Sequence, residues 1–128
     1  MTLTTLDAFC REEKIDRINL AKCDAEGHDL RILRGARPLL QSGRIDVFQF
    51  EYNHCWVFSR AFLRDVFTLV EGLPYVVVRV TAQSLEVHDT WHPELERFFQ
   101  SNFALVHRNA LQWFKTRDAR YSGANTLA

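Results

Sequence analysis

The pattern of apolar and polar side chains in residues 17–26, RINLAKCDAE, predicts a strand that leads directly into acidic residues. Side chains two apart lie on the same side of a strand. One side then carries Ile18, Leu20, Lys22, Asp24 and Glu26, and the other carries Ala21, Cys23 and Ala25. We expect the apolar part to be buried on both faces, as in a parallel strand between helices, and Gly27 to end the strand.

Elsewhere the spacing of apolar residues predicts alternating helices and strands. Helices are predicted around Leu6, Phe9 and Cys10 with Thr4 or Thr5 as the cap, at 29–35, from 37 with Pro38 in the first turn, at 60–70 with Ser59 as the cap, and at 93–99. Further strands are predicted at 45–53, 75–80 and 85–89, with the last at 102–109. A strand, a helix and a strand with short connections predict a right-handed crossover and a parallel pair, so the fold class is α/β.

Composition narrows the class of protein. The 128 residues fit one domain, and 47% of them are hydrophobic, which is enough for a core. Sixteen basic and sixteen acidic residues give a formal net charge of zero, so nothing indicates a nucleic-acid partner or an anionic membrane. No stretch approaches the roughly 20 apolar residues of a membrane span.

The three cysteines and the N-terminal segment indicate a cytoplasmic protein. Cys10, Cys23 and Cys55 are odd in number and lack C-x-x-C spacing, which argues against a disulfide framework and against a structural zinc site. The segment MTLTTLDAFC has no basic region or long apolar run of a signal peptide. The histidines show no H-x-H or H-x-x-x-H spacing, so no histidine metal site is predicted.

Acidic residues follow two strands that we expect to be neighbours. Asp24 and Glu26 come after the first strand, and Glu51 and Asn53 end the second. Ligands of open α/β sheets bind beyond the carboxyl ends of parallel strands. The sequence therefore predicts that these groups converge at one edge of the sheet, as a candidate general base or cation site.

Structural roles are the alternative for each of these residues. An acidic residue at the end of a strand can cap the next helix, and Lys22 can pair with Asp24. His28 lies close to the same edge, where a lone histidine is more readily a loop hydrogen-bond donor than a catalytic base. No serine lies in a G-x-S-x-G turn, and no cysteine lies in the context of a nucleophile.

Four ordered motifs between residues 3 and 53 resemble one known family. They are Thr5-Leu6-Asp7, Lys22-Cys23-Asp24-Ala25-Glu26-Gly27, Leu33-Arg34-Gly35-Ala36, and a strand closing on Glu51. Their order and spacing are similar to the second half of the FkbM-type methyltransferase domain, and NFALVHRN resembles the closing strand of that family.

The resemblance implies an S-adenosylmethionine-dependent methyltransferase that acts on hydroxyl groups of sugars, glycolipids or secondary metabolites. It implies a partial Rossmann-like sheet of parallel strands with a closing antiparallel strand and helices on both faces. Asp24 or Glu51 would be the base that takes the hydroxyl proton. Asp24, Glu26 and Gly27 would contact the cofactor, and His28 and Asn53 the substrate.

One departure from the family pattern concerns glycine. The chain has five glycines, none spaced G-x-G, whereas the cofactor-binding half of the family carries a Gly-rich turn. We therefore expect residues 1–128 to be a single truncated domain that binds little S-adenosylmethionine alone and self-associates through the exposed edge of its first strand. The alternatives are a non-catalytic half-domain that binds a partner and a magnesium-dependent hydrolase built on Asp24, Glu26 and Glu51.

Overall fold

Strands and helices alternate along the chain in the computed structural model, which describes residues 3–121. The strands are β1 (Ile18–Lys22), β2 (Ile45–Tyr52), β3 (Tyr75–Val80), β4 (Leu85–His88), β5 (Ser101–His107) and β6 (Thr116–Asp118). The α-helices are α1 (Leu6–Glu12), α2 (Asp29–Gly35), α3 (Arg37–Gln41), α4 (Cys55–Phe58) and α5 (Leu63–Val70). Two 3₁₀ helices, η1 (Pro93–Leu95) and η2 (Arg108–Trp113), precede and follow β5.

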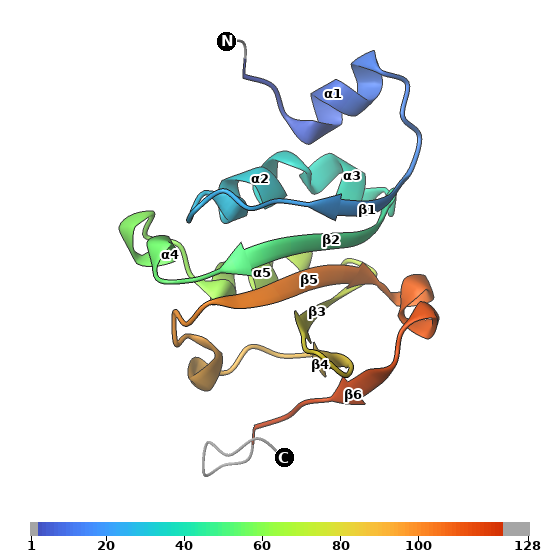
Figure 1. The fold of residues 1–128 in the computed structure, drawn as a ribbon. Coiled ribbons are helices and arrows are strands. Elements are labelled where there is room, and N and C mark those ends of the chain that lie inside the picture. The colour runs from blue at the N-terminus through green and yellow to red at the C-terminus, as the bar shows by residue number, and fades with distance from the viewer. Residues whose placement is uncertain (1–2, 122–128) are drawn as a thin grey trace.

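The six strands form one mixed sheet in the order β1-β2-β5-β3-β4-β6 (Figure 1). β1 and β2 are parallel, with Leu20 opposite Val47, as the crossover through α2 and α3 requires. β5 lies between β2 and β3 and is antiparallel to both. This arrangement confirms the predicted α/β class and a partial Rossmann-like sheet with an antiparallel closing strand.

Local signals set the first half of the fold. The Thr5 hydroxyl accepts a hydrogen bond from the Ala8 amide at 3.2 Å and caps α1, as predicted. α2 ends at Gly35, and α3 begins with Pro38 in its first turn, where a missing amide hydrogen costs least. The predicted break between two short helices is therefore confirmed.

The second half departs from the prediction in three places. Ser59 is not the cap of the helix that follows, because residues 55–58 form α4 and Ser59 ends it. The next helix, α5, starts at Leu63 instead of residue 60. The predicted helix at 93–99 is only the short η1, and the strand at 102–109 is not the last, since β6 follows it and pairs with β4.

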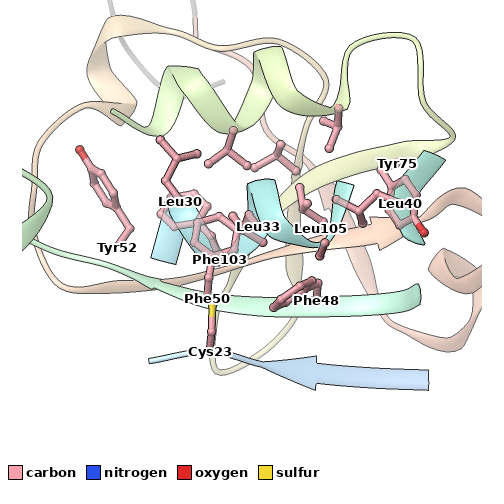
Figure 2. Packing of buried hydrophobic residues seen from close by; sticks show 14 of the residues in the cluster. Cys23, Leu30, Leu33, Leu40, Phe48, Phe50, Tyr52, Tyr75, Phe103 and Leu105 are labelled. Carbon is pink, nitrogen blue, oxygen red and sulfur yellow. The ribbon is translucent and has the colours of Figure 1, made fainter. Parts of the chain in front are cut away.

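The main core lies between the α-helices and one face of the sheet (Figure 2). Leu33 of α2 and Leu40 of α3 meet Phe48, Phe50 and other residues of the central strands, all fully buried. A second, smaller cluster lies on the opposite face, where valines of β2, β3 and β5 pack against Ala110 and Leu111 of η2. Among residues 3–121, no helix has the length and apolar character needed to cross a membrane.

The expectation that β1 is buried on both faces is wrong. β1 is the end strand of the sheet and pairs only with β2 among the described residues. Its Leu20 side chain is 64% exposed, and Lys22 is exposed without an ion pair in the described part of the chain. The number of neighbours that a strand has in its sheet depends on distant segments, so the sequence of β1 alone could not show that it is an end strand.

Candidate functional site

The chain leaves the sheet after β1 through a tight turn that carries the acidic residues. The Cys23 amide still donates to the Gln49 carbonyl of β2 at 2.9 Å, so pairing extends just beyond the strand. Glu26 and Gly27 then adopt positive φ angles of 47° and 94°. The His28 amide closes the turn on the Ala25 carbonyl at 3.1 Å, and α2 begins at the next residue. The turn therefore holds Asp24 and Glu26 at the carboxyl end of β1.

Asp24, Glu26 and Glu51 come together at this edge. One carboxylate oxygen from each residue lies within 4.8 Å of the other two. Asp24 and Glu26 are exposed, and Glu51 is half-buried near the end of β2. The structure thus places in one cluster the three acidic side chains for which the sequence predicted convergence.

Glu51 is the most firmly held of the three. Its Oε1 accepts a hydrogen bond from Gln100 Nε2 at 2.6 Å, and its Oε2 accepts one from Asn53 Nδ2 at 3.3 Å. Its backbone carbonyl accepts from the buried Trp56 indole at 2.9 Å. Glu51 can therefore present its carboxylate in a fixed orientation, whereas the exposed Asp24 and Glu26 are less restrained.

Gln100 was not identified from the sequence. It lies just before β5, and the antiparallel register that places Asn102 opposite Glu51 brings it beside the carboxylate. The hydrogen bond joins residues 49 positions apart in the sequence, and no local motif encodes this pairing. Gln100 is therefore found only once the strands are paired.

Asn53 and Gly27 have structural contacts at the positions predicted for ligand binding. Asn53 is 6% exposed, and its Oδ1 accepts from the Cys55 amide at 2.9 Å, which orients the start of α4. A Cβ built on Gly27 would lie 2.5 Å from the Cys55 carbonyl oxygen, so this glycine permits close packing of the turn against α4. His28 is exposed beside them and makes no side-chain cap on α2. Ligand contacts of these three residues stay predictions.

A thiol also lies at this edge. Cys55 Sγ donates to Glu26 Oε2 at 3.6 Å, and His54 Nε2 lies 3.7 Å from the same sulfur. Burial and the neighbouring Glu26 and Glu51 carboxylates raise the pKa of the Cys55 thiol. A raised pKa keeps the sulfur protonated at neutral pH, which is unsuitable for a nucleophile or a metal ligand.

Asp29 is a buried acid that the sequence analysis missed. It is the first residue of α2, is 1% exposed, and its carboxylate oxygens have no hydrogen-bond partner among the described residues. Burial, together with the nearby Asp29 carboxylate, raises the pKa of the Cys23 thiol. The sequence placed Asp29 only as the start of a helix, because nothing local shows that its side chain turns inward.

This arrangement can perform two kinds of chemistry. Carboxylates that are held in place and reachable from solvent can accept a proton from a bound hydroxyl group. The same oxygen-only donor set is the type that hard divalent cations prefer, and exposed acidic groups often cluster without one. Asp24 and Glu51 suit both roles, and the Cys55 thiol suits neither.

The fold and the site together define an α/β domain with a polar site at the carboxyl ends of two parallel strands. The sequence matches the Methyltransferase FkbM domain over residues 1–121, and the chain belongs to this family. The match confirms the resemblance seen in the motifs around Asp24 and Glu51 and supports methyltransferase function at the level of the family. No curated protein and no solved structure matches the chain.

Proposed function

We propose that this chain is an S-adenosylmethionine-dependent O-methyltransferase domain whose base is Asp24 or Glu51. The observation that carries the proposal is the convergence of three carboxylates at the carboxyl ends of β1 and β2, in a chain of the FkbM methyltransferase family. The acceptor would be a hydroxyl group of a sugar, a glycolipid or a secondary metabolite. A cytoplasmic location belongs to the same proposal.

The carboxylates would deprotonate and orient the acceptor. Glu51, held by Gln100 and Asn53, would accept the hydroxyl proton at Oε1 or Oε2, with Asp24 as the other candidate for this role. A base positioned in this way contributes about 10²–10⁴-fold to a rate. Glu26, which accepts from the Cys55 thiol, would shape the acidic edge beside them.

The negative charge of the acidic cluster suits the positive charge of S-adenosylmethionine. S-adenosylmethionine carries a positive sulfonium and a positive ammonium, and it supplies the methyl group when bound. The exposed Asp24 and Glu26 carboxylates favour such a cation. Gly27 does not leave free space for the cofactor on its Cβ side, because Cys55 fills that space. Because these 128 residues have no G-x-G spacing, we expect weak binding by this chain alone.

A non-catalytic half-domain is the second candidate. The absence of G-x-G spacing favours it, because a partner-binding domain needs no nucleotide turn. It predicts neither cofactor binding nor dependence of any activity on the carboxylates. A magnesium-dependent hydrolase is the weaker third candidate: Asp24, Glu26 and Glu51 could hold the cation, but the sequence shows no phosphate-holding loop.

Transfer of a labelled methyl group from S-adenosylmethionine to a panel of sugars and glycolipids tests the proposal. The donor is supplied at millimolar concentration to offset weak binding, and calorimetry measures its affinity separately. We expect Asp24→Asn or Glu51→Gln to lower the transfer rate by about 10²–10⁴-fold, because an amide cannot accept the hydroxyl proton as the carboxylate does. Glu26→Gln should have a smaller effect.

Glu71→Gln is the matched control, because Glu71 is an exposed acidic residue at the end of α5, away from the cluster. It should leave the rate unchanged. Transfer that is equally fast in wild type, Asp24→Asn and Glu51→Gln would refute the base assignment. A chain that neither binds the donor nor transfers a methyl group would support the non-catalytic half-domain instead.

A further inference from the structure

Large apolar side chains are exposed at the end of the sheet that carries the acidic cluster. Phe58, the last residue of α4, is 81% exposed, and Phe99, between η1 and β5, is 73% exposed. Val57 of α4 is exposed as well. Figure 1 shows α4 and the start of β5 at the end of the sheet where β1 and β2 finish. Single exposed apolar residues are common on protein surfaces, whereas a group of them marks a binding surface.

The Phe58 ring is connected to the acidic cluster through α4. It lies edge-on to the His54 ring, with 6.4 Å between the ring centres. His54 Nε2 is 3.7 Å from Cys55 Sγ, and this thiol donates to Glu26 Oε2. Because the fully buried Trp56 anchors the inner side of this short helix, Phe58 stays at the surface beside the carboxylates.

Phe99 is held beside the cluster by a different segment. Its neighbour Gln100 donates to Glu51 Oε1 at 2.6 Å, which places this segment against the carboxylate. Phe98 takes the inward position: its amide donates to the Tyr52 hydroxyl at 3.1 Å, and its ring centre lies 5.5 Å from that of Tyr52. Phe99 is therefore left at the surface, so two segments that contact the cluster each present an exposed phenylalanine.

We infer that the acceptor is amphipathic, with its hydroxyl group at Glu51 and an apolar group against Phe58 and Phe99. This inference rests on the proposed methyltransferase function and selects, among its acceptors, those in which a sugar carries an alkyl chain or an aromatic ring. Contact of such a group with the two rings removes apolar surface from water on both partners. The surface is continuous with the carboxylates, so one molecule can reach both.

A free sugar fits this surface less well. Its hydroxyl groups need hydrogen-bond partners when water is removed, and the side chains of Val57, Phe58 and Phe99 offer none. The carboxylates of the cluster can hold only the hydroxyl groups that reach them. Binding sites for small molecules commonly combine an apolar lining with a few polar groups that fix orientation, and this surface has both parts.

Calorimetry with octyl β-glucoside and methyl β-glucoside tests this inference. The two probes share one sugar and differ only in the alkyl group, and octyl glucoside is kept below its critical micelle concentration. The full 128-residue chain should bind octyl glucoside at least about tenfold more tightly, because the octyl chain covers apolar surface. Phe58→Ser and Phe99→Ser should each weaken this binding about three- to tenfold, and neither should change the affinity for methyl glucoside.

Trp113→Ser is the matched control. Trp113 is 56% exposed and lines a separate apolar groove of about 390 Å³ on the sheet face away from the α-helices. This variant should bind octyl glucoside as wild type does, and circular dichroism verifies that each variant is folded. Equal affinity of wild type for the two glucosides would overturn the inference. So would a loss of octyl glucoside binding in Trp113→Ser that Phe58→Ser and Phe99→Ser do not share.

Methyl transfer to the two glucosides separates this inference from the proposed function. The calorimetry is done without S-adenosylmethionine, so its result does not depend on transfer. Tight binding of octyl glucoside that depends on Phe58 and Phe99, with no transfer, would support the apolar surface and count against the methyltransferase alone. Transfer to both glucosides with equal kcat/KM would support the methyltransferase and refute the apolar surface.

Discussion

Gly27 lies so close to Cys55 that a Cβ on Gly27 would be 2.5 Å from the Cys55 carbonyl oxygen. Gly27 also has a φ of 94°, a backbone angle that residues other than glycine rarely adopt. We expect Gly27→Ala to lower the free energy of unfolding by about 2–4 kcal/mol, because strain and a steric clash add. Urea denaturation measures this loss.

Gly72→Ala separates the effect of backbone strain from the effect of the steric clash. Gly72 has a similar φ of 75°, but nothing lies within 4 Å of the position that its Cβ would take. The loss at Gly72 should be only about 1 kcal/mol, the cost of backbone strain. Equal losses at the two positions would show that contact with Cys55 contributes nothing.

The Glu96 carboxylate connects η1 to the start of α5. It accepts from the Leu63 and Arg64 amides at 2.7 and 3.1 Å, from the Tyr52 hydroxyl at 2.8 Å and from the Trp91 indole at 3.0 Å. We expect Glu96→Ala to lower the free energy of unfolding by about 2–4 kcal/mol, because four donors lose a charged acceptor. Urea denaturation is again the measurement.

Glu94→Ala is the control for this loss. Glu94 is two residues away and pairs with Arg97, whose side chain is 58% exposed. An exposed ion pair contributes about 0–1 kcal/mol, so this variant should lie close to wild type. If Glu96→Ala were equally mild, the capping role of its carboxylate would be wrong.

Local rules account for what the sequence could predict. Thr5 caps α1 and Pro38 starts α3 through contacts within a few residues. Asp24 and Glu51 were expected to meet because a strand, a helix and a strand with short connections give neighbouring parallel strands, and the structure has them so. The parts of the site that depend on this one crossover could therefore be predicted from the sequence.

Contacts between distant segments account for the rest. Ser59 has the local signature of a cap, but the Leu63 and Arg64 amides at the start of α5 donate to Glu96, which is more than thirty residues away. Gln100 reaches Glu51 only through the register of β2 with β5. Leu20 is exposed on a strand that has one neighbour among residues 3–121, and this position in the sheet is not encoded in the sequence of the strand itself.

His88 should make stability depend on pH near neutrality. It is 2% exposed, and its Nε2 has no hydrogen-bond partner among the described residues. Burial lowers its pKa; Glu86 opposes this shift, and Arg79 and Arg117 add to it. The unfolded chain therefore binds a proton more readily, so the free energy of unfolding should fall as pH drops from about 7 to about 5.

Urea midpoints at pH 7.5 and 5.5 check this dependence. His88→Gln should reduce the difference between the two midpoints, because the group that binds the proton is gone. His28→Gln, which changes an exposed histidine, should keep the wild-type difference. An unchanged difference in His88→Gln would assign the pH dependence to other groups.

Asp46 should also make the free energy of unfolding fall as pH drops, but over a more acidic range than His88. It is 1% exposed and accepts hydrogen bonds from Arg17 Nε at 3.1 Å and Asn19 Nδ2 at 2.8 Å. The hydrogen bond from Arg17 lowers the pKa of the Asp46 carboxyl, against the effect of burial, and Asn19 adds to the lowering. A lowered pKa means that the folded state favours the charged form, so this stabilisation is complete above about pH 5 and is lost as pH falls below about 4.

Asp46→Asn tests this sign. At pH 7 it should lower the free energy of unfolding by about 1–3 kcal/mol, a range reduced because the Arg17 side chain is half exposed. Near pH 3 the variant and wild type should converge, because wild type has then lost the same charge. Asp118→Asn, at an exposed aspartate of β6, should match wild type at both pH values. A deficit in Asp46→Asn that is as large at pH 3 as at pH 7 would mean that shape, and not charge, sets its contribution.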